Sequence, residues 1–173
     1  MLYVCHSIEN RMEDFIKDLG YKALDTRFKR ISDRMGQDIR KVYKKFDIDV
    51  EPNWYLVFMI LKEHQKLSIA EIAEKLNYAH PSVVVIVQKM KAKEYVITES
   101  DLIDKRKQLI SLTEKSVLLL PKLEKLWHSC ERSILAILEE DLSILTSLDN
   151  IDRALKTTSF HERFTTEYSK YKL

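Results

Sequence analysis

Three consecutive cations stand out in the stretch ESDLIDKRKQLISLT, residues 99–113. Lys105, Arg106 and Lys107 follow directly on Asp104, with a short apolar run on either side of the cluster. Ammonium and guanidinium groups bind phosphate strongly, so the cluster could contact a polyanion. Because the net charge of the chain is only +2, polyanion binding would have to come from local clusters such as this one. The alternative is a solvated hairpin whose charges bind no ligand.

Glycine is too scarce for the phosphate-binding loops of common enzymes. The chain has only Gly20 and Gly36, both within helical patterns, whereas such loops need clustered glycines. This excludes P-loop hydrolases, Rossmann dinucleotide enzymes and kinases, and it argues against a coenzyme A pyrophosphate loop. No nucleophile, base and orienting group can be placed together, so the sequence predicts no catalytic site and no cofactor.

Composition indicates a globular protein outside the membrane. Apolar residues make up 45% of the chain, but no run approaches the roughly 18 residues that span a bilayer. The N-terminal segment lacks the basic start, apolar stretch and cleavage site of an export signal. Cys5 and Cys130 are too few for a disulfide framework and fit a reducing compartment. We therefore expect a cytoplasmic protein.

Few residues could form a metal or thiol sensor. Cys5 is followed by His6, and His128 lies two residues before Cys130. Two positions apart on a helix, His128 and Cys130 point to different sides. Without further ligands at a fitting spacing, the sequence predicts no metal site.

Two short helices precede the basic cluster. Ser68 and Glu71 form the capping-box pattern at the start of a helix over residues 69–76. After a four-residue turn, Pro81 suits the first turn of a second helix that runs to about residue 93. This arrangement is typical of a helix-turn-helix. Residues 95–100 and 108–113 then favour two antiparallel strands that carry the basic cluster at their tip.

Helical periodicity covers the rest of the chain. It predicts a long amphipathic helix over about 18–46 with a basic second face, and a buried helix over 52–64. A further helix follows a cap at Thr113 and continues to about 138. Pro121 lies within it and either kinks the helix or moves its start later. A last helix covers about 141–169.

The residues LSIAEIAEKLNYAHPSVVVIVQKMKAKEYV, followed by SDLIDKRKQLISLT, resemble the MarR family of bacterial transcription regulators. The fold this implies is mainly α: a winged helix-turn-helix with a small antiparallel β wing and long helical dimerisation arms. The whole chain, 1–173, would be one domain, with arms at 18–50 and 114–173 and the DNA-binding lobe at 52–113. The sequence is also similar to members fused to an acetyltransferase, although residues for that domain are not expected in this chain.

The resemblance implies roles for individual residues. Arg106 would enter the minor groove, and Asp104 would hold its guanidinium or the loop. The second helix would lie in the major groove, with four residues, Val83, Ile86, Val87 and Met90, facing inward. The residues able to face DNA are His80, Ser82, Val84, Val85, Gln88 and Lys89. Phosphate anchoring would come from Ser68, Lys89, Lys93 and Lys107, with Lys105 at the wing tip.

Val84 and Val85 depart from the family, in which polar or basic residues are usual at those positions. Valine offers only apolar contact, for example to a thymine methyl group, so specificity would rest more on the wing and on DNA shape.

The function implied is a homodimeric repressor that binds a pseudo-palindromic operator in double-stranded DNA and is released by a small aromatic or lipophilic effector. The candidate effector residues are Arg40, Tyr43, Trp54, Tyr55, Phe58 and His64, although these residues suit a core better than a ligand site. Two alternatives stay open. The chain could be a winged-helix module that recruits a protein without reading DNA, or the regulatory half of a separately encoded acetyltransferase.

Overall fold

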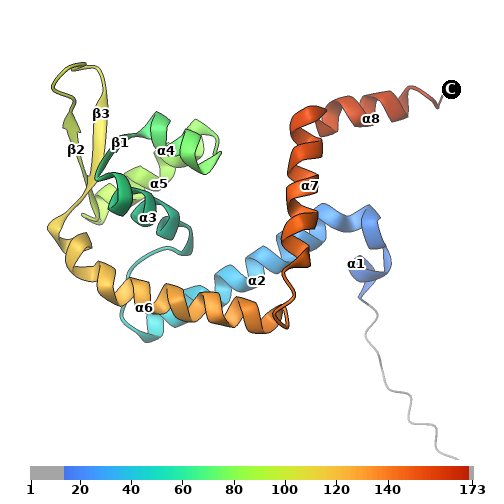
Figure 1. The fold of residues 1–173 in the computed structure, drawn as a ribbon, viewed down its shortest axis with the longest axis horizontal. Helices are drawn as coiled ribbons and strands as arrows, with labels where there is room; N and C mark the ends of the chain where they lie inside the picture. Colours follow the sequence, from blue (N-terminus) through green and yellow to red (C-terminus); the bar gives the residue numbers. More distant parts are fainter. Residues whose placement is uncertain (1–13, 172–173) are drawn as a thin grey trace, which may run out of the picture. The chain divides into compact units, whose positions relative to one another are not determined.

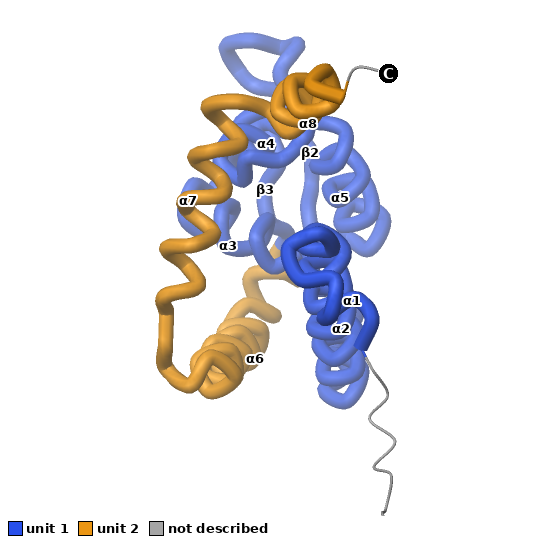
Figure 2. The backbone as a smooth tube through the Cα atoms, turned by 90° about the vertical axis from the view of Figure 1, so that its right-hand side faces the viewer, with its two compact units in different colours: residues 1–113 blue, residues 114–173 orange. Residues whose placement is uncertain are grey.

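The structure, a computed structural model, describes residues 14–171. It divides into two compact units, the first ending at Thr113 and the second beginning at Glu114 (Figure 2). The fold is mainly helical with one small antiparallel sheet, as the sequence predicts, and that sheet lies in the first unit (Figure 1).

The helix-turn-helix is formed by α4 (Ile69–Leu76) and α5 (His80–Ala92), preceded by α3 (Tyr55–His64). The predicted capping box at the start of α4 is present: Ser68 and Glu71 exchange backbone and side-chain hydrogen bonds. Asn77 ends α4 at φ 52°, in the left-handed conformation that asparagine tolerates. The core beneath these helices includes the fully buried Trp54 and Phe58, whose rings meet Tyr95 edge-on.

The wing belongs to a sheet of three strands rather than the predicted two. β2 (Val96–Ser100) and β3 (Gln108–Leu112) form the predicted hairpin, and β1 (Lys66–Ser68) pairs antiparallel with the other edge of β3. Ile110 at the centre of β3 faces Leu67 of β1 and Thr98 of β2. We predict no strand for the β1 segment. A three-residue strand shows no alternation, and its partner lies far along the chain.

The first unit begins with two short helical turns and one long helix. These are α1 (Phe15–Asp18), the 3₁₀ turn η1 (Gly20–Ala23) and α2 (Leu24–Lys45). The prediction of one helix from residue 18 is wrong at its start, because Gly20 adopts φ 58° and interrupts the helix there. Another 3₁₀ turn, η2 (Pro52–Trp54), forms the first turn of the predicted 52–64 helix and leads into α3.

A bidentate ion pair joins α1 to α2. Both terminal nitrogens of Arg30 donate to the carboxylate of Asp14, at 2.7 and 2.8 Å. The Arg30 hydrogen bond lowers the pKa of Asp14 to about 2. This contact fixes the short first helix despite the break at Gly20.

The second unit contains α6 (Glu114–Ile137), α7 (Ser143–Thr157) and α8 (Phe160–Tyr168). Pro121 lies inside α6, which excludes the later start, one of the two alternatives that the sequence leaves open. Proline has no backbone N–H, so Pro121 cannot donate the helical hydrogen bond to the carbonyl of Val117, four residues earlier. Val117 is exposed to water. The prediction of one helix over 141–169 is also wrong. Thr158 is extended, and Ser159 forms a capping box with Glu162 that starts α8.

Several helices end in residues other than glycine with positive φ. Asp47 follows α2 at φ 51°, Gln65 follows α3 at 62°, and Glu94 follows α5 at 59°. Glu139 and Glu140 follow α6 at 51° and 62°. L-amino acids adopt this conformation at a cost in free energy.

None of the helices over residues 14–171 has the length and apolarity required to cross a bilayer.

Candidate nucleic-acid interface

Helix α5 presents two distinct faces. Val83, Ile86, Val87 and Met90 are buried, as we predict for its inward face. On the opposite face the predicted DNA-facing polar residues are exposed: His80, Ser82, Gln88 and Lys89. The face is therefore open to solvent and could lie in a groove about as wide as a helix.

The two valines on α5 are not equivalent. Val85 is 50% exposed, whereas Val84 is only half-buried between the two faces. Val85 is thus the more accessible of the two for an apolar contact with a base. With so few polar groups on this helix, direct hydrogen-bond readout is limited.

The wing tip, residues 101–107, is built from two successive tight turns. A carboxylate oxygen of Asp101 accepts the backbone N–H groups of Ile103 and Asp104, both at 2.8 Å. These hydrogen bonds lower the pKa of Asp101. The N–H of Lys107 then donates to the carbonyl of Asp104 at 2.8 Å, and that of Asp101 donates to the carbonyl of Lys107 at 3.0 Å. The tip is consequently an ordered structure closed by its own hydrogen bonds.

The second turn carries the predicted Asp104–Arg106 pair. Asp104 Oδ1 accepts the backbone N–H of Arg106 at 3.1 Å and its Nε at 3.2 Å. The sequence left two roles open for Asp104, and the structure gives it both, since it bonds the loop and the guanidinium. The Arg106 side chain is nevertheless 93% exposed, so its terminal nitrogens point toward solvent.

Glu71 connects the wing to the helix-turn-helix, a role that sequence reasoning missed. One oxygen of its carboxylate accepts the backbone N–H and hydroxyl of Ser68, both at 2.7 Å. The other oxygen lies 3.3 Å from the ammonium group of Lys107. The Ser68 hydrogen bonds, with a smaller contribution from Lys107, lower the pKa of Glu71 to about 2. The capping pattern in the sequence marks Glu71, but nothing local indicates its bond to the wing.

Two predicted phosphate contacts are engaged elsewhere. Ser68 is only 7% exposed and its hydroxyl belongs to the α4 cap, so this conformation does not present it to a phosphate. Lys93 is paired with Asp49 and lies over the ring of Trp54, 5.7 Å from its centroid. Lys89 and Lys105 are exposed.

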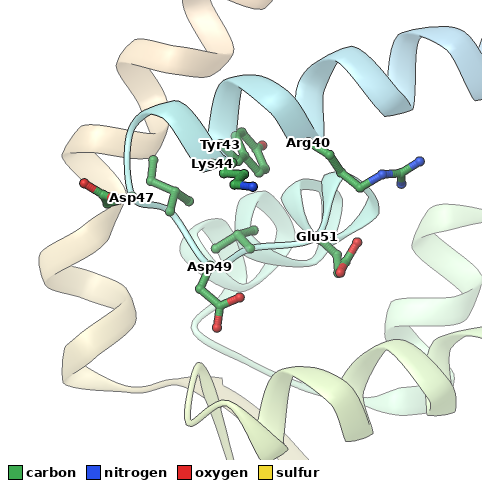
Figure 3. A pocket seen from close by; sticks show the side chains of 8 residues that line it. Arg40, Tyr43, Lys44, Asp47, Asp49 and Glu51 are labelled. Carbon is green, nitrogen blue, oxygen red and sulfur yellow. The ribbon is translucent and has the colours of Figure 1, made fainter.

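A pocket of about 500 Å³ lies where α2 leads into the next loop. It is lined by Arg40, Tyr43, Lys44, Asp47, Ile48, Asp49, Val50 and Glu51. Figure 3 shows the carboxylates of Asp47, Asp49 and Glu51 pointing in different directions, so they do not converge on one ligand.

The six candidate effector residues are divided by the fold. Arg40 and Tyr43 line this pocket, whereas Trp54 and Phe58 fill the core and Tyr55 is 39% exposed. His64 ends α3 and lies near Glu63. Trp54 and Phe58 are therefore core residues, and Tyr43, which is 4% exposed, is buried as well.

The described residues contain no group of three or more potential metal ligands. Cys130 is a half-buried free thiol on α6. Cys5 and His6 lie outside the part of the chain that the structure describes.

Sequence comparison finds a family model that matches the winged region. Residues 48–107 match the model described as MarR family. The HTH-type transcriptional regulator SarZ of Staphylococcus aureus (strain MRSA252) is 28% identical over 82 residues, 46% of this chain. That alignment spans 55% of SarZ, about half its length.

Solved structures share the fold at low identity. The S. aureus MepR–DNA complex is 22% identical, with a TM-score of 0.64 over 80% of this chain and 98% of that one. The repressor CouR, bound to a 23-mer DNA duplex, is 21% identical, with a TM-score of 0.64 over 78% and 96%. Reduced AbfR bound to DNA is 19% identical, with a TM-score of 0.62 over 78% and 93%. The arrangement of α3 to α5 and the wing is thus that of winged-helix proteins.

Proposed function

Because residues 48–107 match the MarR family model, we propose that the protein is a DNA-binding transcription regulator. The observation that carries the proposal is the wing tip, where Asp104 orients Arg106 while leaving its side chain 93% exposed. An arginine held in this way loses little conformational freedom when it enters a narrow minor groove. The exposed polar start of α5 supplies a second surface for the adjacent major groove.

The protein acts as a homodimeric repressor in this proposal. Apolar side chains remain exposed along the helices of the second unit: Ile144, Leu145, Leu148 and Leu155 on α7, and Phe160, Phe164 and Tyr168 on α8. Exposed apolar area of this extent is unusual in a monomer, and a second copy could cover it about a two-fold axis. A dimer would place two copies of α5 on a pseudo-palindromic operator and block polymerase. A DNA-bound repressor works in the cytoplasm, and a small effector could control its release.

Binding to DNA tests the regulator proposal directly. We would measure fluorescence anisotropy of the full chain on its own upstream region and on a scrambled duplex, across a salt series. We expect a preference of about 10³ or more, with affinity falling steeply as salt rises. Selection from random-sequence duplexes would follow if neither duplex is preferred. A selection without enrichment would overturn the proposal.

Sedimentation tests the dimer. The wild-type chain should sediment as a dimer, and Leu148→Glu should shift it toward monomer because a buried unpaired carboxylate is costly. Glu140→Gln, which changes an exposed residue between α6 and α7, is the control. A wild-type monomer at micromolar concentration would contradict this part of the proposal.

A protein-recruiting module is the second candidate function. The exposed Val85 on α5 favours it, because an apolar recognition helix can pack on protein. The exposed basic tip opposes it. A failed DNA selection combined with a stable wild-type fold would make this the better account.

A further inference from the structure

The wing tip exposes an apolar dipeptide as fully as a side chain can be exposed. Leu102 and Ile103 are each 97% accessible to solvent, more than any other large hydrophobic residue in the part of the chain that the structure describes. Leaving both in water forgoes the stabilisation that burial of such side chains would provide. The exposed pair is therefore a candidate contact surface for a binding partner.

The exposure is enforced by the local structure. Asp101 accepts the N–H groups of Ile103 and Asp104, which closes a turn with Leu102 and Ile103 at its bend. This pattern, in which an aspartate side chain bonds backbone N–H groups two and three residues on, is a stable turn of its own. It keeps the dipeptide at the end of the hairpin instead of folding it back onto the sheet.

The apolar pair lies beside a basic pair held in the same manner. Asp104 closes the next turn, and Lys105 and Arg106 occupy the central positions of that turn. Two adjacent turns, each anchored by an aspartate, thus present Leu102–Ile103 and Lys105–Arg106 from one seven-residue tip. A partner that takes both must offer negative charge at its edge and an apolar interior within a few ångströms.

The DNA minor groove has this combination. Its edges are phosphates, its interior is lined by sugars and base edges, and leucine or isoleucine can wedge between base steps there. We propose that Leu102 and Ile103 form an apolar wedge that enters the minor groove beside Arg106 and partly unstacks a base step. This inference rests on the proposed function, because it requires that the wing bind DNA.

The wedge adds selectivity that α5 lacks. Pyrimidine–purine steps, such as TA, unstack most easily, so they are the steps at which a wedge costs least. The guanine amino group protrudes into the minor groove and would obstruct it. The protein therefore selects A·T-rich flexible steps under the wing, at positions that no polar side chain reads.

Matched variants of the tip test the wedge. The probe is the duplex enriched from a random library by the wild-type full chain, labelled at its two ends for energy transfer. Leu102→Ser combined with Ile103→Ser removes the apolar groups but keeps the Asp101 turn and every charge. The control exchanges the pair, Leu102→Ile with Ile103→Leu, and retains the apolar surface. Both sites are fully exposed, so thermal unfolding should be the same in all three proteins.

The expected results separate the wedge from general DNA binding. The serine variant should bind about tenfold more weakly than wild type and should bend the duplex less, whereas the exchanged variant should match wild type in both. Replacing adenine by 2,6-diaminopurine under the wing, which adds the obstructing amino group, should weaken wild type but not the serine variant.

The contrary outcomes are also distinct. Equal affinity and equal bending for wild type and the serine variant would overturn the wedge while leaving the regulator proposal intact, and would direct attention to a protein partner for the tip. If the wild-type chain enriches no duplex, the regulator proposal fails and the wedge fails with it.

Discussion

Asp104 Oδ1 receives two hydrogen bonds from Arg106, one from the backbone N–H at 3.1 Å and one from Nε at 3.2 Å. The same carboxylate oxygen thereby fixes both the backbone and the side chain of that residue. The hydrogen bond between Asp104 and the Arg106 side chain should cost little DNA affinity. It uses the Nε edge of the guanidinium and leaves the terminal nitrogens available for DNA.

Removing Arg106 should weaken DNA binding. For Arg106→Ala we expect a loss of about 1–3 kcal/mol in binding free energy, because charge-assisted contacts to DNA are lost. Asp104→Ala should cost less, since the arginine remains but must be ordered on binding. Anisotropy titration measures both, with Arg132→Ala, an exposed arginine on α6, as the control for net charge. Unchanged affinity of the Arg106 variant would remove the wing from the DNA complex.

Lys107 should contribute to affinity without contributing to specificity. Lys107→Ala should weaken binding to all duplexes about equally and reduce the slope of log K against log salt by about one unit. The reason is that its ammonium, now 3.3 Å from Glu71, can reach a phosphate when the wing docks. A salt series on selected and scrambled duplexes gives the slope. A loss confined to the selected duplex would indicate base readout instead.

Acid should weaken the α4 cap and its bond to the wing. The pKa of Glu71 falls from an ordinary 4.5 to about 2 in the fold, so its stabilising contribution is complete above pH 4.5 and is lost as the pH falls toward 2. The contribution is modest because the side chain is 39% exposed. Glu71→Gln keeps the capping bonds, since glutamine also suits a capping box.

Urea unfolding at several pH values measures this effect. The difference in free energy of unfolding between wild type and Glu71→Gln should shrink between pH 4.5 and pH 2. Glu74→Gln, an exposed neighbour on α4, should follow wild type at every pH. A difference that does not change with pH would show that the Glu71 charge contributes nothing to stability.

Substitutions on the two faces of α5 should change different properties, the folding stability for the buried face and DNA binding for the exposed face. Met90 is fully buried, so Met90→Ala should lower the free energy of unfolding by about 2–5 kcal/mol. Val85→Ala should change it by less than about 0.5 kcal/mol, yet weaken binding to the selected duplex. Replacing thymine by deoxyuridine in that duplex should weaken wild type more than the Val85 variant. Equal sensitivity of the two proteins would place Val85 away from thymine methyl groups.

The helix-turn-helix and the wing could be predicted because their signals are local. The Ser68–Glu71 capping pattern, Pro81 in the first turn of α5 and the apolar spacing from Val83 to Met90 each lie within a few residues. The inward face of α5 follows from the same spacing. Neighbouring residues decide these features, so the folded chain does not override them.

The errors arise where the structure depends on distant partners or on a single backbone angle. β1 exists only because β3 lies beside it, and no pattern within three residues shows that. The break at Gly20 and the start of α8 at Ser159 each turn on one residue within a periodic stretch. The Ser159–Glu162 spacing is a signal that could have divided the last helix. The bond from Lys107 to Glu71 required the folded sheet.

The non-glycine residues with positive φ after the helices make the chain less heat-stable than glycine at the same positions would. Each non-glycine residue held at positive φ lowers the folding stability by roughly 1–2 kcal/mol. Glycine would avoid this cost, and the greater conformational entropy that it gives the unfolded chain would lower the stability by less, roughly 0.4–1 kcal/mol. A single nucleotide change turns an aspartate or glutamate codon into a glycine codon. A single-nucleotide change to a glycine codon should therefore give a more heat-resistant chain, without any change to its core or its wing. This applies at four positions: Asp47, Glu94, Glu139 and Glu140.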